Sequence, residues 1–178
     1  MKIMLDPGHS GPAEPGACVG GVTEAGLVMR IARFTCEELS LRGHEVRLTR
    51  DGPIEDSELD WRSALANDWG ADLFISLHCN AASRIEAEGT EVYHFPGSEQ
   101  GEKLARLLQH HLTQALLTED RGVKTANFQV LRETDCPAVL VECGFITNPV
   151  DRGMLIDSLE QWRIGAAIAV AAGEYEKN

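Results

Sequence analysis

Hydrophobic and polar positions follow two periods along the chain, and the two periods alternate. Apolar residues at helical spacing predict four helices, at residues 24–42, 59–69, 100–117 and 157–175. Short apolar or alternating runs predict six strands, in the segments KIMLD, EVRLT, ADLFISLH, GTEVYHF, NFQVLRETD and PAVLVE. Strands that alternate with helices of crossover length predict a three-layer α/β/α fold, in which helices flank a mostly parallel sheet of about six strands.

The chain has no internal repeat and no Gly/Ser-rich linker, so we expect a single domain over residues 1–178. With 43% hydrophobic and 25% charged residues, the composition is that of an ordinary globular protein. The longest apolar runs fall well short of the ~18–20 residues that a membrane helix needs, so no membrane span is expected.

The net charge of −12 argues against a nucleic-acid-binding protein with a basic surface. It also gives no general attraction to anionic polymers, so an anionic substrate would have to be held by local contacts. The chain has five cysteines and no CxxC pair, which favours a reducing compartment over a disulfide framework. Met1 leads directly into a predicted strand without a basic and an apolar region, so we expect no secretory signal in this chain.

Polar residues of catalytic type follow three of the predicted strands. His9 follows the first strand in DPGHSG, His78 ends the strand ADLFISLH, and Glu142 ends PAVLVE. Glu24 stands at the start of the first long helix. Because ligands of open α/β sheets bind beyond the carboxyl ends of the strands, these four residues could meet at one edge.

Two histidines and one carboxylate are a common ligand set of catalytic zinc. A second carboxylate nearby could act as a general base. The chain has no HExxH motif, and the four residues are far apart in sequence, so spacing alone does not select this hypothesis.

Each candidate also has a structural explanation. His9 could be a turn residue, and His78 could be a buried histidine with satisfied hydrogen bonds. The role of Glu24 could be simply to stabilise the helix N-terminus, where an acidic side chain is favoured. Glu142 is harder to explain in this way, because a carboxylate after three apolar residues is costly unless it is paired or binds a ligand.

Strand alternation separates the candidates from two cysteines. It places His78 and Asn80 on one face of their strand and Cys79 on the other, and it separates Glu142 from Cys143 in the same way. We therefore expect both cysteines to fill the core. We expect three further histidines and the acidic run EDSELD to be solvated, and we leave His94 open because its strand could reach the same edge; the three histidines are His44, His110 and His111.

The sequence resembles the catalytic domain of the zinc-dependent N-acetylmuramoyl-L-alanine amidases (amidase type 3), which cleave bacterial peptidoglycan. Matching segments occur in the family's order over nearly the whole chain: LDPGHSG, TEAGL, VRLTRD, WRSALAND, ADLFISLHCNA, GTEVYHF and DRGVK with FQVLRETDCPAVLVECGFITNPVD. HSG replaces the more frequent HGG, and Cys143 stands where an apolar residue is more frequent. The resemblance implies a twisted mixed sheet flanked by helices.

The resemblance also implies roles for the candidate residues. It implies that His9, Glu24 and His78 bind one Zn²⁺ per chain and that Glu142 is the catalytic carboxylate. The expected reaction is hydrolysis of the amide bond between N-acetylmuramic acid and the L-alanine of the stem peptide. Two further residues could contact the substrate, namely Asn80 and Arg132.

Some relatives carry an inhibitory helix after the second zinc histidine, but here the connection CNAASRIEAEG is too short for one. We therefore expect no partner protein to be required for activation. Two alternatives remain, a non-catalytic module that binds the cell wall and a cysteine hydrolase that uses Cys79 or Cys143. The enzyme would act on the cell wall, either released like a phage endolysin or as a domain of an exported enzyme.

Overall fold

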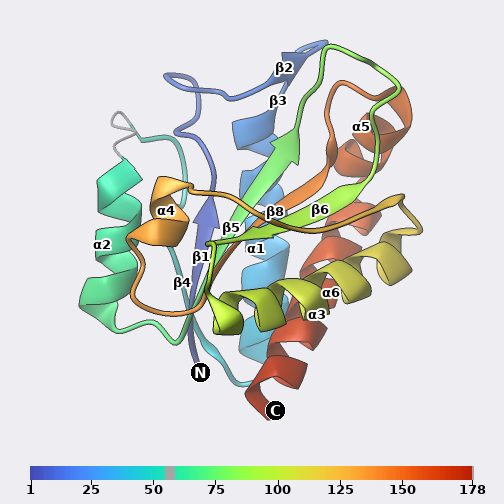
Figure 1. Ribbon diagram of the computed structural model, residues 1–178. Helices are drawn as coiled ribbons and strands as arrows, with labels where there is room; N and C mark the ends of the chain where they lie inside the picture. Colours follow the sequence, from blue (N-terminus) through green and yellow to red (C-terminus); the bar gives the residue numbers. More distant parts are fainter. Residues whose placement is uncertain (55–58, 178) are drawn as a thin grey trace.

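The structure is a computed structural model that describes residues 1–54 and 59–177 (Figure 1). The acidic run expected to be solvated falls mostly in residues 55–58, outside the described residues. In chain order the elements are β1 (Lys2–Pro7), β2 (Cys18–Val19), β3 (Val22–Thr23), α1 (Glu24–Leu41), β4 (Glu45–Leu48), α2 (Leu59–Trp69), β5 (Leu73–Asn80), β6 (Thr90–His94), α3 (Glu99–Leu116), β7 (Asp120–Thr125), α4 (Gln129–Arg132), β8 (Ala138–Phe145), α5 (Pro149–Ile156) and α6 (Ser158–Lys177).

Six strands form one mixed sheet in the order β4-β1-β5-β8-β6-β7. The strands β4, β1, β5 and β8 are mutually parallel. β6 runs antiparallel to β8, and β7 is parallel to β6. The carboxyl ends of β1, β5 and β8 and the amino ends of β6 and β7 therefore lie at the same end of the sheet.

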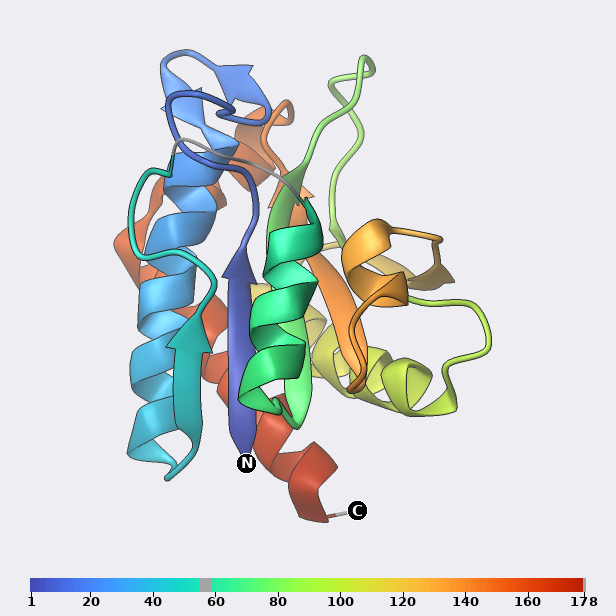
Figure 2. The same cartoon turned by 90° about the vertical axis from the view of Figure 1, so that its left-hand side faces the viewer.

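The sheet separates two layers of helices (Figures 1 and 2). The main core lies between the sheet and α1, α3 and α6, and it takes alternate residues of the central strands, such as Leu77 and Val141. A smaller apolar cluster on the other face includes Phe74 and Leu140, packed against residues of α2 and α4. The predicted three-layer fold and the strand count are confirmed. No helix in residues 1–54 and 59–177 is long and apolar enough to cross a membrane.

One predicted strand is wrong. The segment NFQVLRETD contains the short helix α4, whose Val130 and Leu131 are both buried. The sixth strand is instead β7, with the sequence DRGVKT. β7 lies at the edge of the sheet, where charged side chains can reach water, so its sequence lacks the apolar run that identifies a buried strand.

Candidate active site

His9 lies in the loop that follows β1, with a backbone φ of 62° that is unusual for a residue other than glycine. Two buried arginines hold the backbone of this loop. Arg50 donates from Nε to the carbonyl oxygen of Pro7 (2.9 Å) and from Nη2 to that of Gly8 (2.7 Å). Arg62 donates from Nη2 to the carbonyl oxygen of His9 itself (2.7 Å). The imidazole is therefore presented from a fixed backbone.

Glu24 is the first residue of α1, and the Thr23 side chain caps the helix by accepting a hydrogen bond from the Gly26 amide. The Glu24 carboxylate is almost fully buried. Its Oε1 accepts from the Cys79 amide (3.0 Å), and its Oε2 accepts from the Ala17 amide (3.1 Å). These bonds turn the side chain away from solvent and towards the end of β5.

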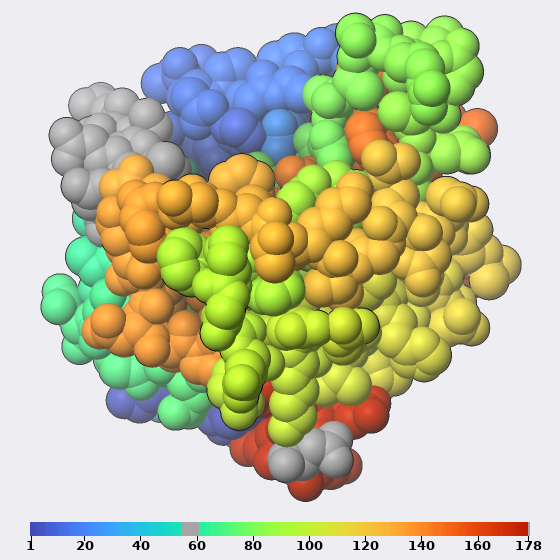
Figure 3. All heavy atoms as spheres, viewed as in Figure 1, coloured from blue at the N-terminus to red at the C-terminus, as the bar shows by residue number. Residues whose placement is uncertain are grey.

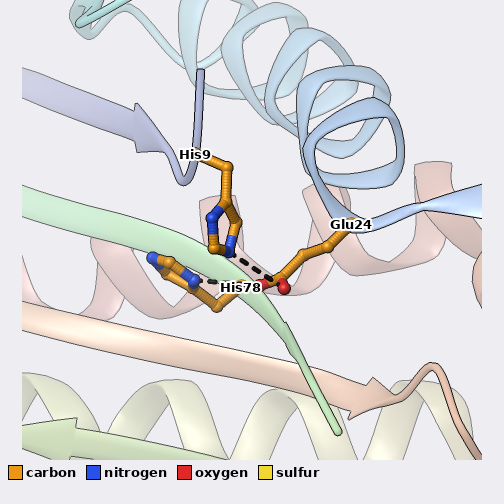
Figure 4. Close-up of side chains that lie close together, drawn as sticks. All are labelled: His9, Glu24 and His78. Atoms are coloured by element: carbon orange, nitrogen blue, oxygen red, sulfur yellow. Dashed lines mark hydrogen bonds and ion pairs between the residues drawn. The ribbon is translucent and has the colours of Figure 1, made fainter. Parts of the chain in front are cut away.

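Glu24 connects the two predicted histidines (Figure 4). Its Oε2 lies 2.9 Å from His9 Nε2, and its Oε1 lies 3.0 Å from His78 Nδ1. One donor atom from each of the three residues lies within 4.8 Å of the other two, which is close enough for all three to hold one metal ion. Glu14 adds a contact at His9 Nδ1 through its Oε1 (2.5 Å).

The ion pairs also set the charge of these groups. Burial disfavours the ionised form of Glu24, but the hydrogen bonds from His78 and His9 outweigh burial and lower the pKa of the carboxyl. For His9, burial favours the neutral ring, but the contacts with Glu24 and Glu14 outweigh it and raise the pKa. Glu24 is therefore ionised at neutral pH, as a metal ligand must be.

Gly8 and Gly16 have no Cβ, and this leaves room for the converging side chains of His9, Glu24 and His78. A Cβ at Gly16 would lie 2.6 Å from both Glu24 Oε2 and the His9 ring. A Cβ at Gly8 would lie 2.4 Å from the His78 ring. Any larger residue at either position would displace one of the three converging side chains.

Glu142 lies directly beside His78 in the parallel pairing of β5 and β8. Burial raises the pKa of its carboxyl to about 7, and the nearby charges of Glu24 and Glu91 add to this effect against the opposing effect of His78. Its Oε2 is buried and accepts no hydrogen bond from the described residues. A carboxyl that titrates near neutral pH and has a free oxygen is suited to proton transfer.

A cleft with a volume of about 460 Å³ joins these groups. His9, His78 and Glu142 line it, together with Phe128 and Gln129 at the start of α4. In the space-filling view the orange segment around α4 lies directly below the blue N-terminal segment (Figure 3). The cleft therefore opens on the face of the sheet that α2 and α4 only partly cover.

The two residues predicted to contact substrate are outside this cleft lining. The Asn80 side chain donates from Nδ2 to Glu91 Oε1 (2.8 Å). Arg132 is exposed at the end of α4 and contacts Asn127 and Glu133. Both side chains are therefore engaged by neighbouring residues of the chain.

The structure places His94, which the sequence left open, and differs from the sequence interpretation of His44. His94 ends β6 and pairs with Val139 of the antiparallel strand β8, so it lies towards the other end of the sheet from Glu142. His44 is buried rather than solvated, with Nδ1 3.5 Å from the N-terminal amine. His110 is exposed as expected, whereas His111 is partly covered and contacts Glu174. The prediction that Cys79 and Cys143 fill the core is confirmed.

Sequence reasoning missed Glu14, Arg50, Arg62 and Glu91. An acidic residue five positions after His9 is a weak signal, since nothing in the sequence shows that the loop folds back on the imidazole. The buried arginines have a clearer signal in retrospect, because each stands in a motif that also matches the amidase family, VRLTRD for Arg50 and WRSALAND for Arg62.

Comparisons with known proteins agree with this geometry. The family model for N-acetylmuramoyl-L-alanine amidase matches residues 3–173. The N-acetylmuramoyl-L-alanine amidase CwlM of Bacillus licheniformis is 37% identical over 162 residues, which cover 89% of this chain and 62% of that protein. The chain therefore spans less than two thirds of the length of this relative.

Solved structures give the same result. The crystal structure of an N-acetylmuramoyl-L-alanine amidase from Clostridium difficile 630 has a TM-score of 0.94 and 31% identity, and the match covers 99% of this chain and 97% of that one. The CwlD amidase of Clostridioides difficile, solved in complex with the GerS lipoprotein, has a TM-score of 0.93 and 26% identity and is covered over 98% of its length, with 99% of this chain. The chain belongs to the N-acetylmuramoyl-L-alanine amidase family.

Proposed function

We propose that this chain is a zinc-dependent peptidoglycan amidase that forms one catalytic domain over residues 1–178. It hydrolyses the amide bond between N-acetylmuramic acid and the L-alanine of the stem peptide. The observation that carries the proposal is the convergence of donor atoms from His9, Glu24 and His78 within 4.8 Å, directly beside the Glu142 carboxyl, whose Oε2 is buried. Family membership supplies the substrate class.

The residues present fit one zinc ion. Two imidazole nitrogens and one carboxylate oxygen are a donor set that zinc accepts with a coordination position left for water or substrate. Gly8 and Gly16 keep that donor set free of obstructing side chains. Glu14 contacts the second nitrogen of His9, which is how a carboxylate fixes the tautomer and orientation of a metal-binding histidine. Zinc bound here supplies a Lewis acid that polarises the scissile carbonyl and lowers the pKa of water.

Glu142 performs the proton transfers of the reaction. Hydrolysis of an amide removes a proton from water and delivers one to the leaving amine. A carboxyl with its pKa raised towards neutrality by burial can do both in turn. The buried Oε2, which has no partner among the described residues, is the atom that we assign to this task. Asn80 and Arg132 remain proposed contacts for more distant parts of the substrate.

Two alternative functions receive less support. A cysteine hydrolase needs an accessible thiolate, but Cys79 and Cys143 are buried in the main core, and burial raises the pKa of both thiols. A module that only binds the cell wall would not need the partly buried carboxyl of Glu142 next to three converging donor groups. These observations favour the metalloamidase.

We further propose that the enzyme needs no partner protein. Residues 81–89, which connect β5 to β6, contain no helix that could cover the cleft. The complex of CwlD with a lipoprotein shows that one relative does have a partner. The proposed site of action is the bacterial cell wall, reached either by endolysin-like release or as a domain of an exported enzyme.

The decisive test of this function is the digestion of purified peptidoglycan by the protein alone. We expect stem peptides with free L-alanine amino termini to appear, to disappear with a chelator and to return when zinc is added back. Absence of release from several wall types while zinc remains bound stoichiometrically would contradict the amidase and favour the binding module. Activity that appears only when a second protein is added would contradict partner independence alone.

A further inference from the structure

The strand register places a row of polar side chains on the face of the sheet that carries the cleft. His78 on β5 pairs with Glu142 on β8, and Glu142 pairs in turn with Glu91 on β6. Residues directly opposite in adjacent strands share a face. The row continues to β7, because Tyr93 on β6 pairs with Lys124. This row of side chains therefore runs from the catalytic end of the cleft to strand β7 at the edge of the sheet.

Glu91 gathers donors from three strands around one buried carboxylate, which is only 2% exposed. Its Oε1 accepts from Asn80 Nδ2 and from the Tyr93 hydroxyl, each at 2.8 Å. Its Oε2 accepts from Arg121 Nε at 2.7 Å and from Lys124 Nζ. Four donors occupy the full accepting capacity of a carboxylate. The cluster holds two cations against one anion and therefore carries a net positive charge.

The two cations keep donors for a ligand. Their side chains are 32% exposed for Arg121 and 37% exposed for Lys124. Arg121 uses Nε for Glu91 and Nη1 for the carbonyl oxygen of Glu88, and it stacks 4.8 Å over the Phe145 ring. A guanidinium has five N–H donors and an ammonium has three, so these contacts use a minority of them. Fixed cations with spare donors are suited to bind a carboxylate.

The surroundings make such a site useful. Glu14 and Glu142 line the catalytic end of the cleft, and the whole chain carries a charge of −12. A net negative charge repels an anionic peptide, so a peptide that bears carboxylates needs local positive charge to bind. Arg121, through its ion pair with Glu91, and Lys124, which pairs with Tyr93 in the register, supply fixed positive charge beside Glu142 in this row.

The distance suits a short peptide. β7 is two strands away from β8, which is about 10 Å at the usual spacing of strands in a sheet. An extended peptide spans about 3.3–3.6 Å per residue. A carboxylate on the second or third residue of a peptide that leaves the Glu142 end would therefore reach the pair.

We propose that Arg121 and Lys124, positioned by Glu91, form an anion subsite that binds a carboxylate on the second or third residue of the leaving peptide. The proposal rests on the proposed amidase function, because that function defines the peptide. This subsite would allow the enzyme to distinguish a free carboxyl group on the stem peptide from an amidated one.

The test compares peptides that begin with L-alanine and carry either a free carboxylate or an amide at the second residue, with a further pair that differs at the third. Calorimetry on the zinc-loaded protein measures Kd, and the corresponding muramyl peptides measure KM and kcat. For one of the two pairs we expect the carboxylate peptide to bind roughly tenfold more tightly than the amide. We expect Arg121→Met and Lys124→Met each to remove most of this preference through KM, with kcat nearly unchanged.

Arg163→Met is the matched control, because Arg163 forms an ion pair with Glu160 on α6, in the helix layer on the other face of the sheet. It should leave the preference intact. Added salt should weaken binding of the carboxylate peptide but not of the amidated peptide. This comparison tests the subsite on the wild-type protein. Equal Kd values within both peptide pairs, or equal losses for carboxylate and amide in the variants, would overturn the subsite. Absence of turnover with the preference in Kd intact would count against the amidase function and not against the subsite.

Discussion

The guanidinium of Arg62 donates a hydrogen bond of 2.7 Å to the backbone carbonyl oxygen of His9. The same guanidinium forms a buried ion pair with Asp6, with 2.5 Å between Nη1 and Oδ1. Arg62 is 2% exposed and Asp6 is 1% exposed. The conformation of the His9 loop is therefore tied to an ion pair in the interior, which links the stability of the fold to the position of a proposed metal ligand.

Replacement of Arg62 tests this link. Arg62→Met removes the partner of a buried carboxylate, which typically costs about 3–5 kcal/mol of the free energy of unfolding. We also expect weaker zinc binding, because the His9 backbone loses a hydrogen bond. Urea unfolding and zinc competition with a chelator measure the two effects. Arg33→Met is the control, since the Arg33–Asp51 pair is exposed and should contribute less than about 1 kcal/mol.

Acid should weaken the fold partly through Asp6. Burial disfavours the ionised carboxyl, but the charge of Arg62 and the hydrogen bonds from Thr49 and Ser76 outweigh burial and lower the pKa. A carboxyl with a lowered pKa stabilises the fold above its ordinary pKa of about 3.9, and this contribution is lost as the pH falls through the folded value. We expect Asp6→Asn to be less stable at pH 7 and to lose less stability on acidification. Urea unfolding between pH 7 and pH 3 measures both slopes, and equal slopes for the two proteins would contradict this assignment.

Substitutions at two glycines distinguish the cost of backbone strain from damage to the proposed metal site. Gly16 and Gly20 both have positive φ, at 67° and 59°, but only a Cβ at Gly16 would collide with Glu24 and His9. Gly20→Ala should cost about 1–2 kcal/mol in stability and leave zinc affinity unchanged. Gly16→Ala should lower zinc affinity by at least tenfold as well. If both variants bind zinc equally well, the narrow space around Glu24 is not needed for metal binding.

The sequence predicts the buried central strands of this fold better than its edge strand. β5 and β8 are buried on both faces, so their apolar runs identify them, whereas the edge strand β7 carries Arg121 and Lys124 and has no such run. His9, His78 and Glu142 follow from the rule that ligands lie beyond strand ends. Glu24 does not, because an acidic residue at a helix start is ordinary.

The contacts that position the site are not visible in the sequence. Arg62 lies 53 positions after His9, and Glu91 lies 51 positions before Glu142. Their partners depend on the sheet register and on the direction of each side chain. Alternation within one strand predicts a face, as it does for Cys79, but it does not predict which residue of a neighbouring strand lies opposite.

The measurement that tests the central claim most directly is zinc content and amidase turnover on the same preparations of the wild type, Glu142→Gln and Glu24→Gln. We predict that Glu142→Gln keeps about one zinc per chain and loses turnover by at least a hundredfold. Glu24→Gln should lose zinc affinity and turnover together, because it removes one of the three donor groups. If Glu142→Gln loses the metal while Glu24→Gln retains it, the two carboxylates have been assigned to each other's roles.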